Sequence, residues 1–408
     1  MYNDLDTLYE FPTLKSTKVK YFDYASTTFM PYSVMNSWKK YNVSCGVSIG
    51  RGSSILSNKA TKELKKSEQV FKDFFGFDEE YDFIYAKNVT EGINLISLAI
   101  KENVNALDII LVGPFEHHSN YLPWKRLAKE NGALFFEIPV LDNGEIDYDY
   151  IKKYKSRIKI ISISSVCNTF GYKINIDKIC DIIDYNTFLF VDDSQFATHN
   201  KLVQNDKISG HFISSHKMYG PKNISLIALK KDVIYKLSPV LLGGGMVETV
   251  GYNSTWLEDR RKFFSGTMDI SLVVAFADAC KFMESFGFEL IQKRDEIYYH
   301  IIEQCLLENG YNIVRIGECV NYIISFTHPK IHSHDINEYL SKENIIIRSG
   351  NVCSQNSLKK IEFSSINRIS FGLGVSLRDI YYLCDCLRRI VNEENVFKES
   401  VWFGISKK

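Results

Sequence analysis

Residues 213–221 read Ile-Ser-Ser-His-Lys-Met-Tyr-Gly-Pro and place Lys217 between two short apolar runs, 211–213 and 224–229. The first run predicts a buried strand that ends at Ser-Ser-His-Lys, and the Gly-Pro pair predicts a turn before the second run. A lysine at the mouth of such a strand can lose its hydration, which lowers its pKa and makes it a nucleophile suited to Schiff-base chemistry. Taken alone, a lysine that ends a strand is more often an ordinary solvated residue, so the interpretation depends on segments upstream.

The overall composition is that of a globular protein with no bias toward charged partners. The 408 residues are too many for one small core and predict two or three domains. Lys+Arg and Asp+Glu balance at 49 each, so no global field attracts nucleic acid or anionic lipid, and neither is expected as a partner. No apolar run reaches the roughly 18 residues that a membrane span needs.

The cysteines and the N-terminus predict a cytoplasmic protein. Nine cysteines are scattered without the spacing of a disulfide framework, which is typical of a reducing compartment. Residues 1–10 are polar and acidic and lack the apolar segment of a signal peptide. The close pair Cys384 and Cys386 falls in a predicted helix, where residues two apart point to different faces, so no metal site is expected.

Apolar runs alternate with helical patterns from residue 81 onward. The pattern predicts strands at 81–86, 108–113, 133–140, 158–165 and 187–192, and helices at 91–101, 119–131 and 177–184. This alternation predicts βαβ units, a mostly parallel sheet and an α/β fold. Ligands of such sheets bind at the carboxyl ends of the strands. We therefore expect one crevice to be surrounded by residues 88–90, residues 116–118, Asn168, Asp192 and Lys217.

The C-terminal part of the chain is predicted to form a smaller α+β domain. A loop at Gly243-Gly244-Gly245 is expected to be flexible, and a long helix at 270–286 leads into the second domain. That domain is predicted to contain helices at 288–309, at 335–342 and up to 392, and strands near 311–326, 344–348 and 368. We predict a large domain at 20–280 and a small domain at 281–408, which the N-terminal arm, 1–19, joins.

Two segments of the expected crevice have the chemistry to hold an aldehyde cofactor that carries a phosphate and a pyridine ring. Thr90 stands where a helix begins, and free N–H groups with the helix dipole suit a phosphate. The alternative is that Thr90 only caps the helix. Asp192 ends a strand, where a buried carboxylate can keep a pyridine nitrogen protonated, or can simply cap a turn. Asp193 is expected to point away from it, toward solvent.

Histidines and arginines near the same crevice suit a flat ring and an amino-acid substrate. His117 or His118 can stack on an aromatic ring and act as acid or base, or can be ordinary loop residues. Arg348 and Arg368 can each bind a carboxylate through two parallel hydrogen bonds.

Cys353 lies between these two arginines on a loop of polar residues. A thiol in such a loop beside positive charge can be exposed and partly ionised. The alternative for any cysteine is a small buried hydrophobic residue. That alternative suits other members of the set better, namely Cys180, Cys280, Cys305 and Cys384.

Together these segments resemble the class V aminotransferase family of pyridoxal-phosphate enzymes. Within it they are most similar to the group II (SufS/CsdA-like) cysteine desulfurases and selenocysteine lyases. The resemblance covers nearly the whole chain and rests on a set of motifs: Phe22-Asp23-Tyr24-Ala25-Ser26-Thr27-Thr28, Arg51-Gly52, Thr90-Glu91-Gly92-Ile93-Asn94, Glu116-His117-His118-Ser119-Asn120, Asn168, Asp192 with Gln195, Ser214 with His216-Lys217, Gly266-Thr267 and Arg348 to Cys353. The family implies fold type I, with a mostly parallel seven-stranded sheet in the large domain and a smaller C-terminal α+β domain.

The resemblance also implies which residues hold pyridoxal 5′-phosphate. Lys217 would form the Schiff base, Asp192 would hold the pyridine nitrogen, and His117 would stack on the ring. The phenolic oxygen would be bonded by Asn168 and Gln195. The phosphate would be held at Val89, Thr90, Ser214 and His216, with Thr267 and Arg51 reaching in from the other subunit of a homodimer.

On the substrate side, the resemblance implies a small amino acid and a thiol nucleophile. Arg368 would take the substrate carboxylate, with Arg348, Arg51 and Asn351 close by. Cys353 would remove sulfur from L-cysteine, leaving alanine and a persulfide on itself for a possible sulfur-acceptor protein.

The chain departs from the family pattern at a few positions on the substrate side. Tyr24 stands where the family usually has Asn, Gly50 where it has His, and Asn351-Val352 where it has two histidines. The substrate therefore stays open among cysteine, selenocysteine and other cysteine derivatives. The alternatives are a C–S or C–Se lyase, an aminotransferase or an epimerase for which Cys353 is not essential, or a degenerate enzyme that serves as a scaffold.

Overall fold

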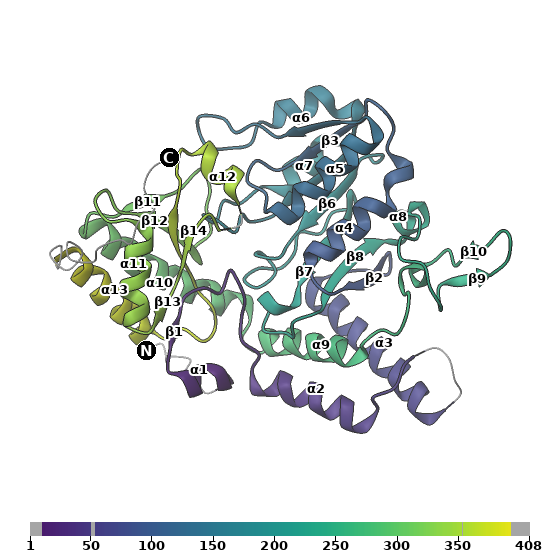
Figure 1. Ribbon diagram of the computed structural model, residues 1–408, viewed down its shortest axis with the longest axis horizontal. Helices are drawn as coiled ribbons and strands as arrows, with labels where there is room; N and C mark the ends of the chain where they lie inside the picture. The colour runs from purple at the N-terminus through teal and green to yellow at the C-terminus, as the bar shows by residue number, and fades with distance from the viewer. Residues whose placement is uncertain (1–9, 50–53, 353, 393–408) are drawn as a thin grey trace, which may run out of the picture.

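A computed structural model describes residues 10–49, 54–352 and 354–392, and two sheets divide them into a larger and a smaller lobe (Figure 1). The larger lobe is built on a seven-stranded sheet of order β2-β8-β7-β6-β5-β3-β4. Its strands are β2 (Tyr81–Ala86), β3 (Ile109–Val112), β4 (Leu134–Glu137), β5 (Ile158–Ser164), β6 (Phe188–Asp192), β7 (Ile208–Ser214) and β8 (Ser225–Lys230). Strands β3 to β7 run parallel, whereas β8 is antiparallel to both β7 and β2. The predicted α/β fold with a mostly parallel sheet is confirmed.

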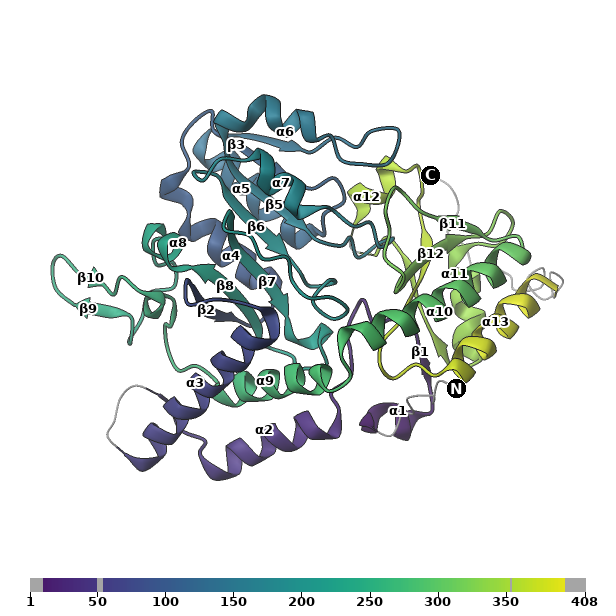
Figure 2. The same cartoon turned by 180° about the vertical axis from the view of Figure 1, so that it is seen from behind.

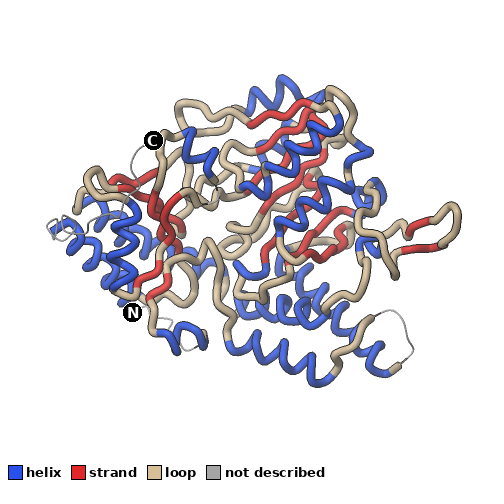
Figure 3. Tube along the Cα trace, in the orientation of Figure 1, coloured by secondary structure: helices blue, strands red, loops and turns tan. Residues whose placement is uncertain are grey.

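Helices cover both faces of this sheet, which is why its central strands carry apolar residues on both of their faces. Every residue of β3, β6 and β7 is buried. One face packs against α4 (Val89–Ala99), α5 (Leu122–Asn131) and α8 (Lys231–Lys236). The other face packs against α3 (Ile55–Phe75), α6 (Tyr148–Tyr154), α7 (Ile176–Ile182) and α9 (Ile270–Glu284), and α2 (Tyr32–Ser44) lies against α9. The three layers can be followed in Figures 2 and 3.

The smaller lobe contains a four-stranded antiparallel sheet of order β11-β12-β15-β14. Its strands are β11 (Asn312–Val314), β12 (Ile323–Thr327), β15 (Ile366–Ser370) and β14 (Arg348–Gly350), and its helices are α10 (Phe288–Glu308), α11 (Ser333–Lys342), α12 (Gln355–Lys360) and α13 (Leu377–Asn392). From the N-terminal side, α1 (Pro12–Thr17) leads into β1 (Lys20–Tyr21), which pairs with β13 (Ile345–Ile346). The domain boundary at residue 280 stays a prediction.

A hairpin follows the triple glycine, where the sequence predicted only a flexible loop. It consists of β9 (Val247–Thr249) and β10 (Thr255–Trp256), and it projects from the larger lobe in Figure 1. Strands this short are too brief to show an alternating pattern, so the periodicity of the sequence could not reveal them.

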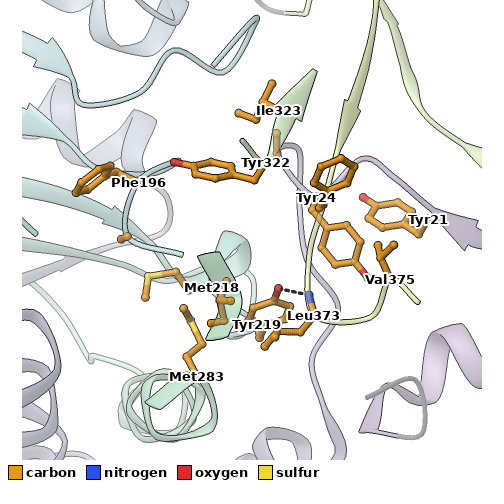
Figure 4. Close-up of a cluster of buried hydrophobic side chains, with 14 of the residues drawn as sticks. Tyr21, Tyr24, Phe196, Met218, Tyr219, Met283, Tyr322, Ile323, Leu373 and Val375 are labelled. Atoms are coloured by element: carbon orange, nitrogen blue, oxygen red, sulfur yellow. Dashed lines mark hydrogen bonds between the residues drawn. The ribbon is translucent and has the colours of Figure 1, made fainter. Parts of the chain in front are cut away.

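A cluster of aromatic and aliphatic side chains joins the two lobes next to Lys217 (Figure 4). Tyr219 belongs to this cluster, and its hydroxyl accepts a hydrogen bond of 2.7 Å from the N–H of Leu373. Tyr24 lies in the same cluster with only 4% of its surface exposed, and its ring fills the space beside Gly372 where a side chain would otherwise sit. The residue that departs from the family pattern at position 24 is therefore part of the packing between lobes.

The eight cysteines that the structure describes are free thiols, and the prediction that Cys180, Cys280, Cys305 and Cys384 are buried is confirmed. Among the described helices, none combines the length and the apolar character needed to cross a lipid bilayer.

Candidate active site

A cavity of about 200 Å³ opens at the carboxyl ends of the parallel strands, between the two lobes. Most of the predicted site residues line it: Val89, Thr90, His117, Asn168, Asp192, Gln195, Ser214, His216, Lys217, Arg348 and Arg368. The prediction that strand ends gather around one crevice therefore holds for these residues. Glu116 and His118 were expected there too, but Glu116 lies behind the wall and His118 turns toward α12.

The remaining predicted residues lie elsewhere. Thr267 lines a second cavity of about 660 Å³ together with Arg260 and Phe264. Asn351 is exposed and is not part of the wall of the first cavity as far as the structure describes it. Arg51 and Cys353 fall outside the described residues.

The turn that presents Lys217 is fixed by contacts from distant parts of the chain. The carbonyl of Lys217 accepts a hydrogen bond of 3.0 Å from the Thr198 hydroxyl. Tyr219 has a left-handed backbone with a φ of 61°, and its N–H donates to the Thr28 hydroxyl at 2.7 Å. Gly220 follows because an added Cβ at this position would collide with the Ser215 side chain. The lysine is therefore presented on a rigid turn.

Asp192 ends β6 and is 7% exposed. One of its carboxylate oxygens accepts the N–H of Ser194 at 3.0 Å. Burial raises the pKa of this carboxyl, while the positive charge of Lys217 acts against that shift. A carboxyl in these surroundings gains strongly from a cationic partner in the cavity.

Asp193 is buried rather than solvated, so the prediction that it points toward solvent is wrong. Its carboxylate bonds to the His211 ring at 2.7 Å and also to the Ser165 hydroxyl. Asp193 does point away from Asp192, as strand alternation requires, but the far face of the sheet is covered by other elements.

The start of α4 combines free N–H groups with a chain of hydroxyls. The side chain of Asn88 accepts the N–H of Glu91 at 2.9 Å, so Asn88 caps the helix and Thr90 does not. A helix has no internal acceptor for its first N–H groups, here those of Val89 and Thr90. The Thr90 hydroxyl bonds to that of Ser119 at 2.6 Å. This end of the cavity suits a bound anion.

The two histidines at the cavity, His117 and His216, are both held in the neutral form. Burial and the nearby charge of Lys217 lower the pKa of each to about 4. The Nδ1 atom of His117 accepts the N–H of Ser119 at 3.2 Å, so the proton of its neutral ring is on Nε2. The ring of His216 bonds to the Thr27 hydroxyl at 3.1 Å.

Glu116 is a buried carboxyl that sequence reasoning did not assign to any role. It accepts hydrogen bonds from the Ser164 N–H at 2.7 Å, the Ser164 hydroxyl at 2.5 Å and the Asn120 side chain at 2.7 Å. Burial raises its pKa to about 7. Ser164 lines the cavity, so Glu116 supports the wall from behind.

Arg368 is 2% exposed and forms an ion pair with Asp23. The sequence analysis included Asp23 in a family motif but did not predict that it pairs with Arg368. The guanidinium donates to an Asp23 oxygen at 2.6 Å and to the Asn168 carbonyl at 2.7 Å. Arg348 stands opposite Arg368 in the β14–β15 pairing. Two guanidiniums beside one carboxylate leave a net positive charge, which suits a substrate with a single carboxylate.

The amides of Asn168 and Gln195 make contacts within the chain. The Asn168 side chain donates to the Val352 carbonyl at 2.9 Å, and that of Gln195 donates to the Ala25 carbonyl at 2.7 Å. The oxygen of the Asn168 amide and the hydroxyl of Ser194 are both buried without a hydrogen-bond partner. Buried polar atoms without partners at a cavity wall indicate that a polar ligand belongs there.

These observations fit pyridoxal phosphate. The helix start and hydroxyls at Thr90 and Ser119 match a phosphate, and Asp192 matches a protonated ring nitrogen. Lys217 supplies an amine, and His117 supplies a flat neutral ring at the same cavity.

Comparison with known proteins gives a consistent result. The model of the aminotransferase class-V family matches residues 20–383. The probable cysteine desulfurase of Staphylococcus aureus is 28% identical over 400 residues, which cover 94% of this chain and 96% of that protein. The corresponding protein of Staphylococcus epidermidis is 28% identical over 396 residues, which cover 93% of this chain and 95% of that protein.

Solved structures of similar proteins cover nearly the whole chain. The apo cysteine desulfurase from Thermococcus onnurineus matches with a TM-score of 0.89 and 25% identity, over 96% of this chain and 99% of that chain. The cysteine desulfurase CsdA from Escherichia coli matches with a TM-score of 0.87 over the same shares. At 21% identity this second likeness shows the fold alone.

Proposed function

This chain belongs to the aminotransferase class-V family of pyridoxal-phosphate-dependent enzymes, and on that basis we propose that it is a cysteine desulfurase. It would bind pyridoxal 5′-phosphate in the cavity between the lobes and remove sulfur from L-cysteine. The products would be alanine and a persulfide on Cys353. The observation that carries the proposal is that Lys217, Asp192, His117 and Arg368 all line this one cavity.

Residues of the larger lobe are assigned to the cofactor. Bound pyridoxal phosphate supplies an aldehyde that captures amines and a protonated ring that accepts electrons. Lys217 would attach to the aldehyde, and the buried Asp192 would keep a proton on the ring nitrogen. Thr90, Ser214 and His216 would bind the phosphate. The amides of Asn168 and Gln195 would give up their hydrogen bonds to the carbonyls of Val352 and Ala25 and would bond instead to the phenolic oxygen of the cofactor.

Residues of the smaller lobe are assigned to the substrate. Arg368, oriented by Asp23, would bind the carboxylate of cysteine, and Arg348 would add positive charge at the entrance. Lys217 Nζ would take the proton from the substrate Cα atom. The Cys353 thiolate would attack the substrate Sγ atom, so that an S–S bond forms and the Cβ–Sγ bond breaks. The electron pair and a proton end on Cβ, which gives alanine.

A panel of amino acids tests the substrate. Purified protein loaded with cofactor is expected to release alanine from L-cysteine and to turn over selenocysteine, with products identified by mass. Cysteine sulfinate and cystine serve as comparison substrates. Release of pyruvate and ammonia, or of a new amino acid by exchange of the amino group, would contradict desulfuration and would favour a lyase or an aminotransferase.

We also propose that the enzyme is a homodimer in which each cavity is completed by the partner. Thr267, expected at the phosphate, lines a separate cavity of its own subunit. Large apolar side chains are exposed in two regions near it, on α2 and the start of α3 and along the segment that carries the hairpin: Trp38, Val43, Ile55, Leu56, Leu241, Leu242, Val250 and Tyr252. Exposed apolar surface of this kind marks a contact with another protein chain.

Mixed dimers give the test of this arrangement. Lys217→Ala and Thr267→Ala homodimers are each expected to have low activity. Consider a mixed dimer with one subunit of each variant. If Thr267 acts across the interface, one of its two sites contains both an intact Lys217 and an intact Thr267. The mixed dimer is then expected to recover about half of the wild-type activity. Recovery no greater than that of the Thr267→Ala homodimer would place Thr267 within its own subunit's site.

The remaining assignments follow from the same proposal. The persulfide would be passed to a sulfur-acceptor protein, and the enzyme would work in the cytoplasm, where its free thiols stay reduced. The larger and smaller lobes would correspond to domains at 20–280 and 281–408.

A further inference from the structure

The segments on both sides of position 353 are bound to the larger lobe. Before it, the Val352 carbonyl accepts a hydrogen bond from the Asn168 side chain. After it, the Ser354 hydroxyl donates to the Glu116 carbonyl at 3.1 Å, and the N–H of Gln355 donates to the Nε2 atom of His118 at 3.3 Å. The partners of Ser354 and Gln355 belong to the segment after β3 that also carries His117, whereas Asn168 follows β5.

Lys360, the last residue of α12, forms an ion pair with the larger lobe, whereas the contacts of Ser354 and Gln355 are neutral hydrogen bonds. Its Nζ atom donates to the Pro114 carbonyl at 2.8 Å and forms an ion pair with the Glu137 carboxylate. The same atom lies 5.7 Å from the centre of the Phe115 ring. Glu137 is held in turn by the Tyr121 hydroxyl at 2.8 Å. The Glu137 carboxylate with which Lys360 pairs is therefore already held in place by Tyr121.

The helix that carries Lys360 depends on such contacts. With six residues, α12 is too short to be stable without tertiary support. Ser357 and Leu358 form the buried side of α12, and they are 0% and 1% exposed. In Figures 1 and 2, α12 lies on the flank of the smaller lobe that faces the larger one.

We propose that Lys360 is a positioning residue, which holds residues 354–360, next to Cys353 in the chain, against the segment that bears His117. Lys360 does not touch the cavity that the structure describes, so its effect would be exerted through the position of the thiol. The part of the proposal that concerns sulfur removal rests on the proposed function, whereas the part that concerns the position of Cys353 does not.

Lys360 adds a charged contact to the neutral hydrogen bonds of the same segment. The lysine joins the smaller lobe to the loop after β3 at a point close to the Ser354 and Gln355 contacts, so three adjacent anchors act on one short segment. Removing the charged anchor leaves the neutral hydrogen bonds at Val352, Ser354 and Gln355, which are weaker than charge-assisted ones. The segment would then sample positions in which the thiol is farther from the substrate.

The test compares Lys360→Met with Lys360→Arg and with Lys359→Met, all as loaded full-length enzyme. Lys359 is the neighbouring lysine of α12, and it is exposed, which makes it a matched control. The first readout is the rate at which iodoacetamide alkylates Cys353, followed by mass spectrometry of the peptide. The second is kcat and KM for alanine formation from cysteine, and the third is the cofactor absorbance band.

For Lys360→Met we expect Cys353 alkylation to accelerate about fivefold and kcat to fall by about the same factor, which is the upper end of what one partly exposed ion pair contributes. KM and the absorbance band are expected to be unchanged, Lys360→Arg to behave like wild type, and Glu137→Gln to reproduce Lys360→Met. Alkylation in Lys360→Met at the rate of Lys359→Met would overturn the proposal, whatever happens to kcat. Faster alkylation without a change in kcat would support the positioning role and count against Cys353 as the nucleophile.

Discussion

Replacement of Lys217 by alanine is expected to abolish the absorbance band near the visible edge that the wild-type protein shows with pyridoxal phosphate, and to lower turnover by about 10³-fold or more. In the proposed function this amine attaches the cofactor to the cavity and then moves a proton, so the variant would lose both roles. The measurement is an absorbance spectrum of freshly purified protein, with the turnover of cysteine determined in parallel.

Lys222→Ala is a suitable control for this experiment. Lys222 lies on the same stretch of chain, is exposed, and is not part of the cavity wall that the structure describes. Its variant is expected to keep both the band and the activity. A band that persists unchanged in Lys217→Ala would contradict the assignment of the amine, and its absence from the wild-type protein would favour a scaffold without a cofactor.

Replacement of Cys353 by alanine is expected to lower alanine formation from cysteine by about 10²-fold or more, since the variant would lack the proposed nucleophile that receives the sulfur. The absorbance band and its response to added cysteine should remain, because Lys217 and Arg368 are intact. The measurement is the yield of alanine and sulfide, together with the mass of the protein before and after incubation with cysteine. Wild-type protein should gain the mass of one sulfur atom, and Cys353→Ala should not.

Cys319→Ala provides the matched control, because Cys319 is the one cysteine of the described part of the chain that is not buried. Wild-type turnover by Cys353→Ala would reject the persulfide step. The site would then be that of a C–S lyase, an aminotransferase or an epimerase. The replacement of two family histidines by Asn351 and Val352 makes this experiment the most direct way to separate these functions.

The sequence was sufficient to predict the sheet and the cluster of residues at its edge, for a physical reason. Buried strands such as β3 and β6 are almost entirely apolar, and Asp192 is the polar residue with which β6 ends. The rule that parallel strands present their carboxyl ends on one edge then places Asp192 near Lys217 without knowledge of the tertiary contacts.

Contacts between distant segments could not be predicted in this way. Arg368 is paired with Asp23 near the opposite end of the chain, and no local pattern marks either residue as the other's partner. The burial of Asp193 was missed for a related reason, since it depends on which elements cover the far face of the sheet. The cap formed by Asn88 is a local contact with Glu91, and it was missed because Asn and Thr both cap helices, so the sequence did not fix the first residue of α4. The ion pair between Lys360 and Glu137 is another contact between distant segments that no local pattern predicts.

The long-range bonds that hold the lysine turn also bear on biosynthesis. Thr28, near the beginning of the chain, bonds to the turn from one side, and Leu373, near its end, bonds to Tyr219 from the other. A nascent polypeptide on the ribosome therefore lacks a finished binding pocket until almost all of it has been translated. Under the proposed function, capture of the vitamin-derived group would follow translation of nearly the whole chain, and prematurely terminated products that lack β15 would not complete the pocket.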